Sequence, residues 1–212
     1  MSSEKTKDII LHTAIDLFNW RGVDEVTLRD IALECGISPG NLAYHYKNKD
    51  YLIRDAFRQM THDRDKIFLK IRNIPSFQNV DNQLKTVLDL SHKYQFLFLD
   101  MALILRKYPN IAKVRRLQIV TYLRYGKASL DYAVGTDNVL SEEREGQYKR
   151  LSNQIWMYFN FWLAKQQLLN PDEIVDYQDF RMGFWEMLLP ILTEKGKYNL
   201  KKVIPELFQN SK

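Results

Sequence analysis

The sequence predicts an all-α protein, with a three-helix N-terminal domain followed by a larger helical domain. Apolar residues recur at helical spacing along the chain, and strand-like alternation between turns is absent. Helix-ending residues are frequent up to about residue 50 and rarer afterwards, so short helices should precede long ones. We therefore expect one domain over residues 1–54 and a second over residues 55–212.

The first helix is expected over about Lys5–Arg21. Its apolar stripe has the spacing i, i+4, i+7, i+8, formed by Ile10, Ala14, Leu17 and Phe18. Gly22 follows, and glycine is a common residue just after the end of a helix. The stripe predicts which face of this helix is buried.

Two short helices and a turn should come next. Thr27 is a candidate N-cap with Asp30 in the capping-box position, and Gly36 can end the second helix in the left-handed conformation. Ser38 is expected to cap the third helix, with Pro39 at its first position. This arrangement is a helix-turn-helix. A fourth helix should start after a cap at Asn48 and run towards residue 72.

Longer helices are expected after Pro75, over residues 80–107, 111–133, 142–169, 171–193 and 200–208. Pro109, Gly135 and Pro171 should mark breaks, and Pro190 should kink or end a helix. Residues 134–141 are expected to form a flexible loop.

Composition excludes several classes of protein. The 212 residues carry a net charge of +5, but residues 1–54 hold 7 Lys and Arg against 8 Asp and Glu. The single cysteine, Cys35, excludes an intrachain disulfide and a Cys-rich zinc site. His12, His62 and His92 lack metal-ligand spacing, so we expect no metal and no other cofactor. The absence of a signal peptide and of a long apolar run predicts a cytoplasmic protein without a membrane span.

The outer side of the third helix has the character of a DNA-contacting surface. At 100° per residue, Leu42 and Tyr46 should face inward together with Pro39. Small and polar residues should face outward or lie at the edge, namely Gly40, Asn41, Ala43, Tyr44, His45 and Lys47. A helix with this face fits the major groove of duplex DNA. Lys49, at the positive end of the fourth helix dipole, could bind a phosphate there.

Other interpretations stay open for these residues. Tyr44 and His45 could be ordinary surface residues that pack on neighbouring helices, and Lys47 and Lys49 could be solvated cations. The near-neutral N-terminal segment also leaves room for a helical interaction protein whose helix-turn-helix binds a protein partner. Steep salt dependence of binding to duplex DNA would distinguish the two functions. An enzyme is not expected, because no phosphate loop, nucleophile elbow or metal pair is present.

Residues 14–53, "AIDLFNWRGVDEVTLRDIALECGISPGNLAYHYKNKDYLI", resemble the DNA-binding region of the tetracycline-repressor (TetR) family of bacterial regulators. The resemblance implies an all-α homodimer that binds a palindromic operator, and a C-terminal domain that binds an unidentified small-molecule effector. By position, the implied operator contacts are Thr27, Arg29, Ser38, Pro39, Gly40, Asn41, Tyr44, His45 and Lys49. Ala43 departs from the family, where many members have an aromatic residue. The expected function is that of a ligand-responsive transcriptional repressor.

Two helical segments of the C-terminal domain are apolar on nearly every side, Ile155–Leu169 and Phe180–Leu192. Such helices must be buried on every side, which suggests the core on one face and a second subunit on another. The alternative is that both are central helices of a monomer core. The candidates for either role are Trp156, Phe159, Trp162, Phe184, Trp185 and Leu188.

The effector pocket is only weakly indicated. Lys93, Asp100 and Lys107 recur every seven residues and should form a solvated charge stripe. Gln95 and Arg106 fall on another face and are pocket candidates. Aromatic residues that could line the same pocket, or simply fill the core, are Phe98, Tyr122, Tyr125 and Tyr158.

Overall fold

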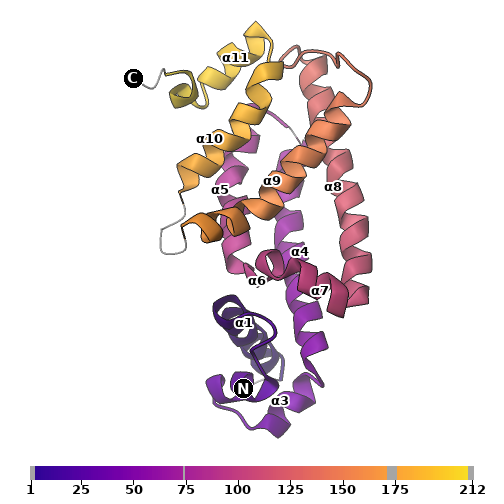
Figure 1. The fold of residues 1–212 in the computed structure, drawn as a ribbon, viewed down its shortest axis with the longest axis vertical. Coiled ribbons are helices and arrows are strands. Elements are labelled where there is room, and N and C mark those ends of the chain that lie inside the picture. Colours follow the sequence, from indigo (N-terminus) through magenta and orange to yellow (C-terminus); the bar gives the residue numbers. More distant parts are fainter. Residues whose placement is uncertain (1–2, 74, 171–175, 210–212) are drawn as a thin grey trace. The chain divides into compact units, whose positions relative to one another are not determined.

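The computed structural model describes residues 3–73, 75–170 and 176–209, and it is helical throughout (Figure 1). Its α-helices are α1 (Ser3–Arg21), α2 (Leu28–Glu34), α3 (Pro39–His45), α4 (Lys49–Asn73), α5 (Phe77–Lys93), α6 (Phe96–Leu99), α7 (Met101–Lys107), α8 (Pro109–Gly135), α9 (Gln147–Leu169), α10 (Tyr177–Leu188) and α11 (Glu194–Lys201). Two 3₁₀ turns follow α10 and α11, at Leu189–Ile191 and Pro205–Phe208. Within the described residues the only β pairing is an isolated bridge between Val139 and Leu192.

The chain divides into two compact units. Unit 1 contains Met1–Asp63 and His92–Arg115, and unit 2 contains Arg64–Ser91 and Arg116–Lys212. Unit 1 is therefore the helix-turn-helix segment together with α6, α7 and the start of α8. Its core includes fully buried apolar residues from α1, α2, α3 and α4, and the ring of Phe96 from α6 packs 5.2 Å from that of Phe18.

The segment predicted as one helix over residues 80–107 is broken into α5, α6 and α7. Asn19 of α1 supplies the physical reason. Its side-chain amide donates to the carbonyl of Lys93 at 3.0 Å and accepts from the backbone N–H of Phe96 at 3.1 Å. One distant side chain thus satisfies a carbonyl at the end of α5 and an N–H at the start of α6, which makes the break stable.

The predicted charge stripe is solvated only in part: the side chains of Lys93 and Lys107 are about half exposed, but all three charged residues have partners within the chain. Lys93 pairs with Asp63 at 2.8 Å, and Lys107 pairs with Asp24 at 2.7 Å. The carboxylate of Asp100 accepts a hydrogen bond from the backbone N–H of Val23 at 3.1 Å. Lys93 therefore joins α5 to α4, and Asp100 and Lys107 join α6 and α7 to the loop between α1 and α2.

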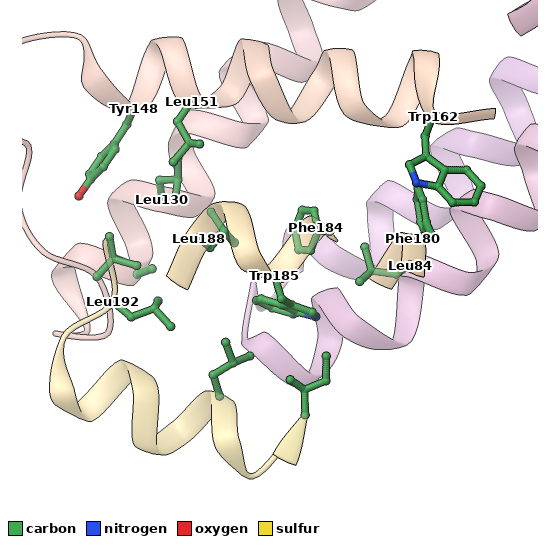
Figure 2. Close-up of a cluster of buried hydrophobic side chains, with 14 of the residues drawn as sticks. Leu84, Leu130, Tyr148, Leu151, Trp162, Phe180, Phe184, Trp185, Leu188 and Leu192 are labelled. Atoms are coloured by element: carbon green, nitrogen blue, oxygen red, sulfur yellow. The ribbon is translucent and has the colours of Figure 1, made fainter. Parts of the chain in front are cut away.

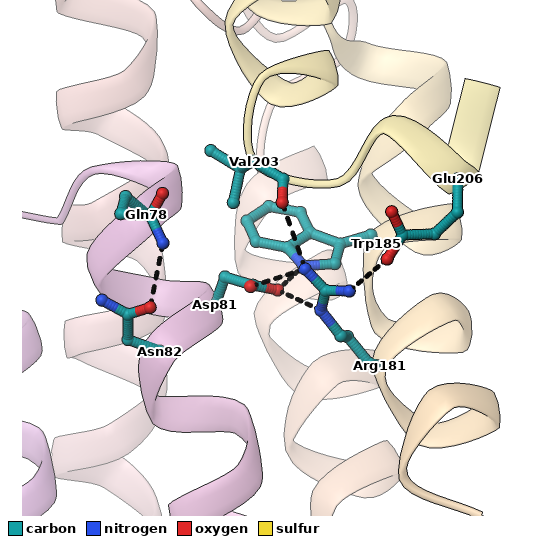
Figure 3. Close-up of polar contacts among 7 residues, drawn as sticks. All are labelled: Gln78, Asp81, Asn82, Arg181, Trp185, Val203 and Glu206. Atoms are coloured by element: carbon teal, nitrogen blue, oxygen red, sulfur yellow. Dashed lines mark hydrogen bonds and ion pairs between the residues drawn. The ribbon is translucent and has the colours of Figure 1, made fainter.

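Unit 2 has its own apolar core, in which Trp185 of α10 is completely buried (Figure 2). Leucine and aromatic side chains from α5, α8, α9, α10 and α11 surround it. Beside this core lies a buried ion pair, drawn in Figure 3. Arg181 donates two hydrogen bonds of 2.8 Å to Asp81, which also accepts from the indole N–H of Trp185 at 2.8 Å. Arg181 also pairs with Glu206, so the network joins α5 and α10 to the second 3₁₀ turn.

The later helices differ from prediction mainly at their starts. α9 begins at Gln147 rather than near residue 142. Gly146, just before it, has a φ of 74°, which is not a helical conformation. The Glu142 carboxylate accepts hydrogen bonds from the N–H groups of Gly146 and Tyr148, and these bonds hold the residues before α9 in a turn. α10 ends at Leu188, so the predicted break at Pro190 is confirmed. The start of the helix predicted over residues 171–193, with the break at Pro171, lies outside the described residues.

The helix predicted over residues 200–208 is wrong. Thr193 caps α11 through a hydrogen bond from the N–H of Gly196 at 2.9 Å, so this helix begins earlier. Residues 134–141, predicted as a flexible loop, are held by backbone hydrogen bonds from Leu140 to Ile191 and from Thr193 to Asn138. Among the described helices, none is both long enough and apolar enough to cross a membrane.

Candidate nucleic-acid interface

The start of α2 is fixed by a complete capping box. The Thr27 hydroxyl oxygen accepts from the backbone N–H of Asp30, and the Asp30 carboxylate accepts from the N–H of Thr27 at 2.7 Å. The Thr27 hydroxyl also donates to this carboxylate at 2.7 Å, and the two hydrogen bonds that Thr27 donates hold the pKa of Asp30 below its usual value. Arg29 is exposed on the first turn and is available to a partner outside the chain. The predicted cap is therefore confirmed.

The turn and the inner side of α3 set the orientation of this helix. Gly36 has a φ of 64°, a conformation that suits glycine, and Ser38 caps α3 by accepting from the N–H of Asn41. Leu42 and Tyr46 are almost fully buried, and the Tyr46 hydroxyl hydrogen-bonds Asp55 at 3.3 Å. Burial and the negative charge of Asp55 raise the pKa of Tyr46, so its hydroxyl stays protonated. These contacts hold one face of α3 on the protein.

The opposite face of α3 is open to solvent. Tyr44 is 81% exposed, and Gly40 and Asn41 are exposed beside it. A methyl group added at Gly40 would meet only the Ser38 hydroxyl, at 4.0 Å. Pro39 is also exposed, so the expectation that it faces inward is wrong, because its position at the first turn keeps it clear of the core.

His45 lies at the edge of this face, half-buried, with its ring 5.1 Å from that of Tyr44 in an edge-to-face contact. Lys47 is exposed just after α3. The surface that the sequence predicts to contact DNA thus contains small residues, the exposed phenol ring of Tyr44 and the cation of Lys47. A seven-residue helix of this kind, held from behind, is suited to lie in a major groove.

Lys49 forms hydrogen bonds within the chain that the sequence did not predict. Its ammonium donates hydrogen bonds to the carbonyls of Val23 at 2.7 Å, Val26 at 2.9 Å and Asp24 at 3.4 Å. Burial lowers the pKa of Lys49 from its ordinary value. The cation therefore joins the start of α4 to the loop between α1 and α2. Asn48 caps α4, as predicted, by accepting from the N–H of Tyr51 at 3.3 Å.

The candidate pocket residues are divided between the two units. In unit 1, Gln95 donates to the carbonyl of Asn19 at 2.8 Å, Phe98 is buried and Arg106 is exposed. In unit 2, three tyrosines remain, each half-buried: Tyr122, Tyr125 and Tyr158.

Two of these tyrosines have defined neighbours. Tyr122 stacks on Phe68 with ring centroids 4.9 Å apart, and the guanidinium of the buried Arg64 lies 4.4 Å from its ring. Tyr158 stacks on Phe180 and donates to that residue's carbonyl at 2.7 Å. Tyr158 is thus part of the unit 2 core, whereas Tyr122 lies beside a buried cation.

Most of the residues predicted for the dimer interface are already buried within the single chain. The side chains enclosed within unit 2 are Trp162, Phe184, Trp185 and Leu188. Phe159 is half-buried and stacks on Phe184, and Trp156 is half-buried beside Phe161. The sequence missed the apolar residues that α9 does expose, namely Met157, Phe161, Leu168 and Leu169.

Comparisons with known proteins agree with this geometry. Residues 10–56 match the family described as "Bacterial regulatory proteins, tetR family", and residues 57–200 match the one described as "Bacterial transcriptional repressor". The chain is 27% identical over 92 residues to the HTH-type transcriptional regulator UidR of Escherichia coli K12, a match that covers 43% of this chain and 45% of UidR. The chain thus spans less than half the length of that curated relative.

Two solved structures have the same fold. A TetR-family transcriptional regulator from Marinobacter aquaeolei VT8 has a TM-score of 0.81 and 21% identity, over 95% of this chain and 98% of the other. A gamma-butyrolactone receptor described as ArpA-like has a TM-score of 0.68 and 14% identity, over the whole of both chains. Together with the profile matches, which span most of the sequence, these results show that the chain belongs to the TetR family of bacterial transcriptional regulators.

Proposed function

We propose that the protein is a homodimeric repressor that binds a palindromic operator and releases it when a small molecule binds its C-terminal domain. The observation that carries this proposal is the outer face of α3, where Gly40, Asn41 and Tyr44 are exposed while Leu42 and Tyr46 hold the helix from behind. Two copies of this face, about 34 Å apart, would reach successive major grooves on one side of the DNA. The protein would act in the cytoplasm, where its DNA lies.

Dimerisation also accounts for the weak charge of residues 1–54, where acidic residues outnumber basic ones by one. Once the first half-site is bound, the second contact is intramolecular and needs little intrinsic affinity. Arg29 and Lys47 would supply phosphate contacts, each of which releases counterions and makes binding salt-dependent.

The surface proposed for the dimer is the exposed stripe of α9. Met157, Phe161 and Leu168 follow one another at i, i+4 and i+11, which places them on one side of the helix. Phe161 is 50% exposed and Leu168 is 83% exposed. Apolar side chains on one stripe are suited to pack against the same stripe of a second copy in a C₂ pair.

Tyr122 and the adjacent Arg64 support an effector site in unit 2, because a buried cation beside an aromatic ring suits an anionic or aromatic ligand. The ArpA-like structure is called a receptor for a gamma-butyrolactone, which is a precedent for small-molecule binding on this fold.

Selection of bound fragments from genomic DNA tests the operator proposal. A palindromic consensus with half-sites about one helical turn apart is expected. Recovery of random fragments, or a slope of log affinity against log salt near zero, would contradict it.

The dimer proposal is tested separately. Phe161→Glu should convert the protein to monomer in sedimentation experiments, while Tyr198→Glu, at an even more exposed aromatic position of α11, should leave the dimer intact. Dimers of unchanged stability in Phe161→Glu would place the interface elsewhere.

A further inference from the structure

A surface hollow on the DNA-binding unit is not used by the proposed operator contacts. It has a volume of about 300 Å³ and is lined by Thr13, Asp16, Leu17 and Trp20 of α1 and by Glu34 of α2. The four α1 residues follow the spacing i, i+3, i+4, i+7, so they share one side of that helix. The opposite wall is the C-terminal end of α2.

Trp20 is the large apolar element of this hollow, and it is 78% exposed. By contrast, Trp162 and Trp185 are buried in the core of unit 2. An indole that contributes so little to packing leaves its ring face accessible to a ligand. Of the aromatic side chains, tryptophan attracts cations most strongly.

Two carboxylates complete the hollow. Glu34 is the last residue of α2, whose final turn has no basic residue. A negative charge at that end of a helix opposes the helix dipole, so Glu34 destabilises its own helix slightly. Within the described parts of the chain, neither Asp16 nor Glu34 forms an ion pair. Their charges are therefore available to a cation from outside the chain.

We propose that this hollow binds an organic cation, a substituted ammonium or guanidinium group, between the Trp20 indole and the carboxylates of Asp16 and Glu34. Nucleic acid is excluded as the occupant, because the carboxylates would repel phosphates. The volume suits one such group. The indole favours an alkylated or planar cation over a hydrated metal ion, since a weakly hydrated charge loses less water when it meets a ring face.

A matched pair of probes tests the recognition of charge. Choline and its neutral isostere 3,3-dimethylbutan-1-ol differ in charge but hardly in shape. Binding is followed by the NMR signal of the Trp20 indole N–H, which is identified by its absence in Trp20→Leu. Choline should bind at least about tenfold more tightly than the alcohol, which corresponds to about 1.4 kcal/mol. Equal binding of the two probes, or no shift of the Trp20 signal with either of them, would overturn the proposal for a free ammonium ligand.

Variants test the residues. Asp16→Asn combined with Glu34→Gln should weaken choline binding at least about tenfold, whereas Leu33→Ala, at an 81% exposed neighbour that does not line the hollow, should not change it. These side chains are exposed, so the variants should keep the thermal midpoint of the parent, and that midpoint is measured beside each titration. Choline binding that survives the double substitution in a folded protein would overturn the proposal.

A second pair of probes distinguishes a free molecule from a side chain of a protein partner. N-acetyl-arginine amide carries the guanidinium group, and the citrulline analogue is its neutral counterpart. Tighter binding of the arginine amide than of choline identifies a cationic side chain as the natural occupant, and the reverse order identifies a free ammonium compound. If neither cation binds better than its neutral counterpart, the hollow is not a cation site.

Discussion

The ammonium nitrogen of Lys49 lies 2.7 Å from the carbonyl oxygen of Val23, so the first residue of α4 is joined to the loop that follows α1. The same ammonium reaches the carbonyl of Val26 at 2.9 Å, just before the cap of α2. A lysine at the start of a helix opposes the dipole, and these carbonyl acceptors compensate for that cost. Lys49 thus holds the loop that leads into α2.

Lys49→Met should therefore reduce the free energy of unfolding by about 1–3 kcal/mol, because it leaves carbonyls without their charged donor. Urea unfolding measures this change. Lys47→Met is the matched control: it should leave stability within about 0.5 kcal/mol, weaken operator binding, and reduce the salt slope by about 1. Unchanged stability in Lys49→Met would show that the three hydrogen bonds contribute nothing to the fold.

Gly40→Leu should block operator binding without harming the fold. The position has open space around it, so a leucine side chain would project from the outer face of α3 into the groove. We expect a loss of affinity of at least about tenfold by fluorescence anisotropy. Gly135→Leu, also in open space but at the end of α8, should bind as the parent does. Normal operator binding by Gly40→Leu would exclude this face of α3 from the interface.

Asp81→Ala should destabilise unit 2 by about 3–5 kcal/mol, because it leaves the buried Arg181 without its main partner. The double variant Asp81→Leu with Arg181→Met removes both charges and should be more stable than Asp81→Ala. Thermal unfolding of the three proteins provides the comparison. The reverse order of the two variants would mean that the ion pair stabilises the fold beyond what apolar packing can supply.

Asp63 should make the stability of unit 1 depend on pH. Burial acts to raise the pKa of this carboxyl, but hydrogen bonds from Lys93 and Tyr94, each 2.8 Å long, outweigh burial and hold the pKa below 3.8. A lowered pKa in the folded state gives stabilisation that is present above 3.8 and lost as the pH falls through the folded value.

The difference in melting temperature between the parent protein and Asp63→Asn should accordingly shrink as the pH falls below about 4. Titration of the Asp63 carboxyl carbon by NMR checks the direction of the shift. A difference that stays constant down to acid unfolding would rule out this carboxyl as a source of the pH dependence.

The caps of the short helices were predictable because they are local. The capping box of Thr27 and Asp30, the Ser38 cap and the Asn48 cap each join residues three positions apart, and all were identified from the sequence. The break between α5 and α6 was not, because the groups that stabilise it come from Asn19, more than seventy residues earlier. A local sequence pattern cannot indicate a hydrogen-bond partner that lies so far away in the sequence.

The role of a buried apolar residue was equally hidden. A helix that is apolar on every side must be covered, but the pattern does not say by what, and most of the interface candidates proved to be core residues. The exposed stripe of α9 emerged only from the structure, since Phe161 and Trp162 are neighbours of the same character. The sequence showed that Lys49 lies at the start of a helix, but it did not show which carbonyls the ammonium contacts.

The connection between α8 and α9 is held in its conformation by residues that come more than fifty positions later in the sequence. The Thr193 hydroxyl donates to the carbonyl of Asp137, Asn199 donates to Asn138, and Gly196 packs so closely on Asn138 that a side chain would not fit. During synthesis on the ribosome, this connection emerges more than fifty residues before its partners. Unit 2 must therefore remain incomplete for several seconds of translation, and chaperones have access to its apolar core during that interval.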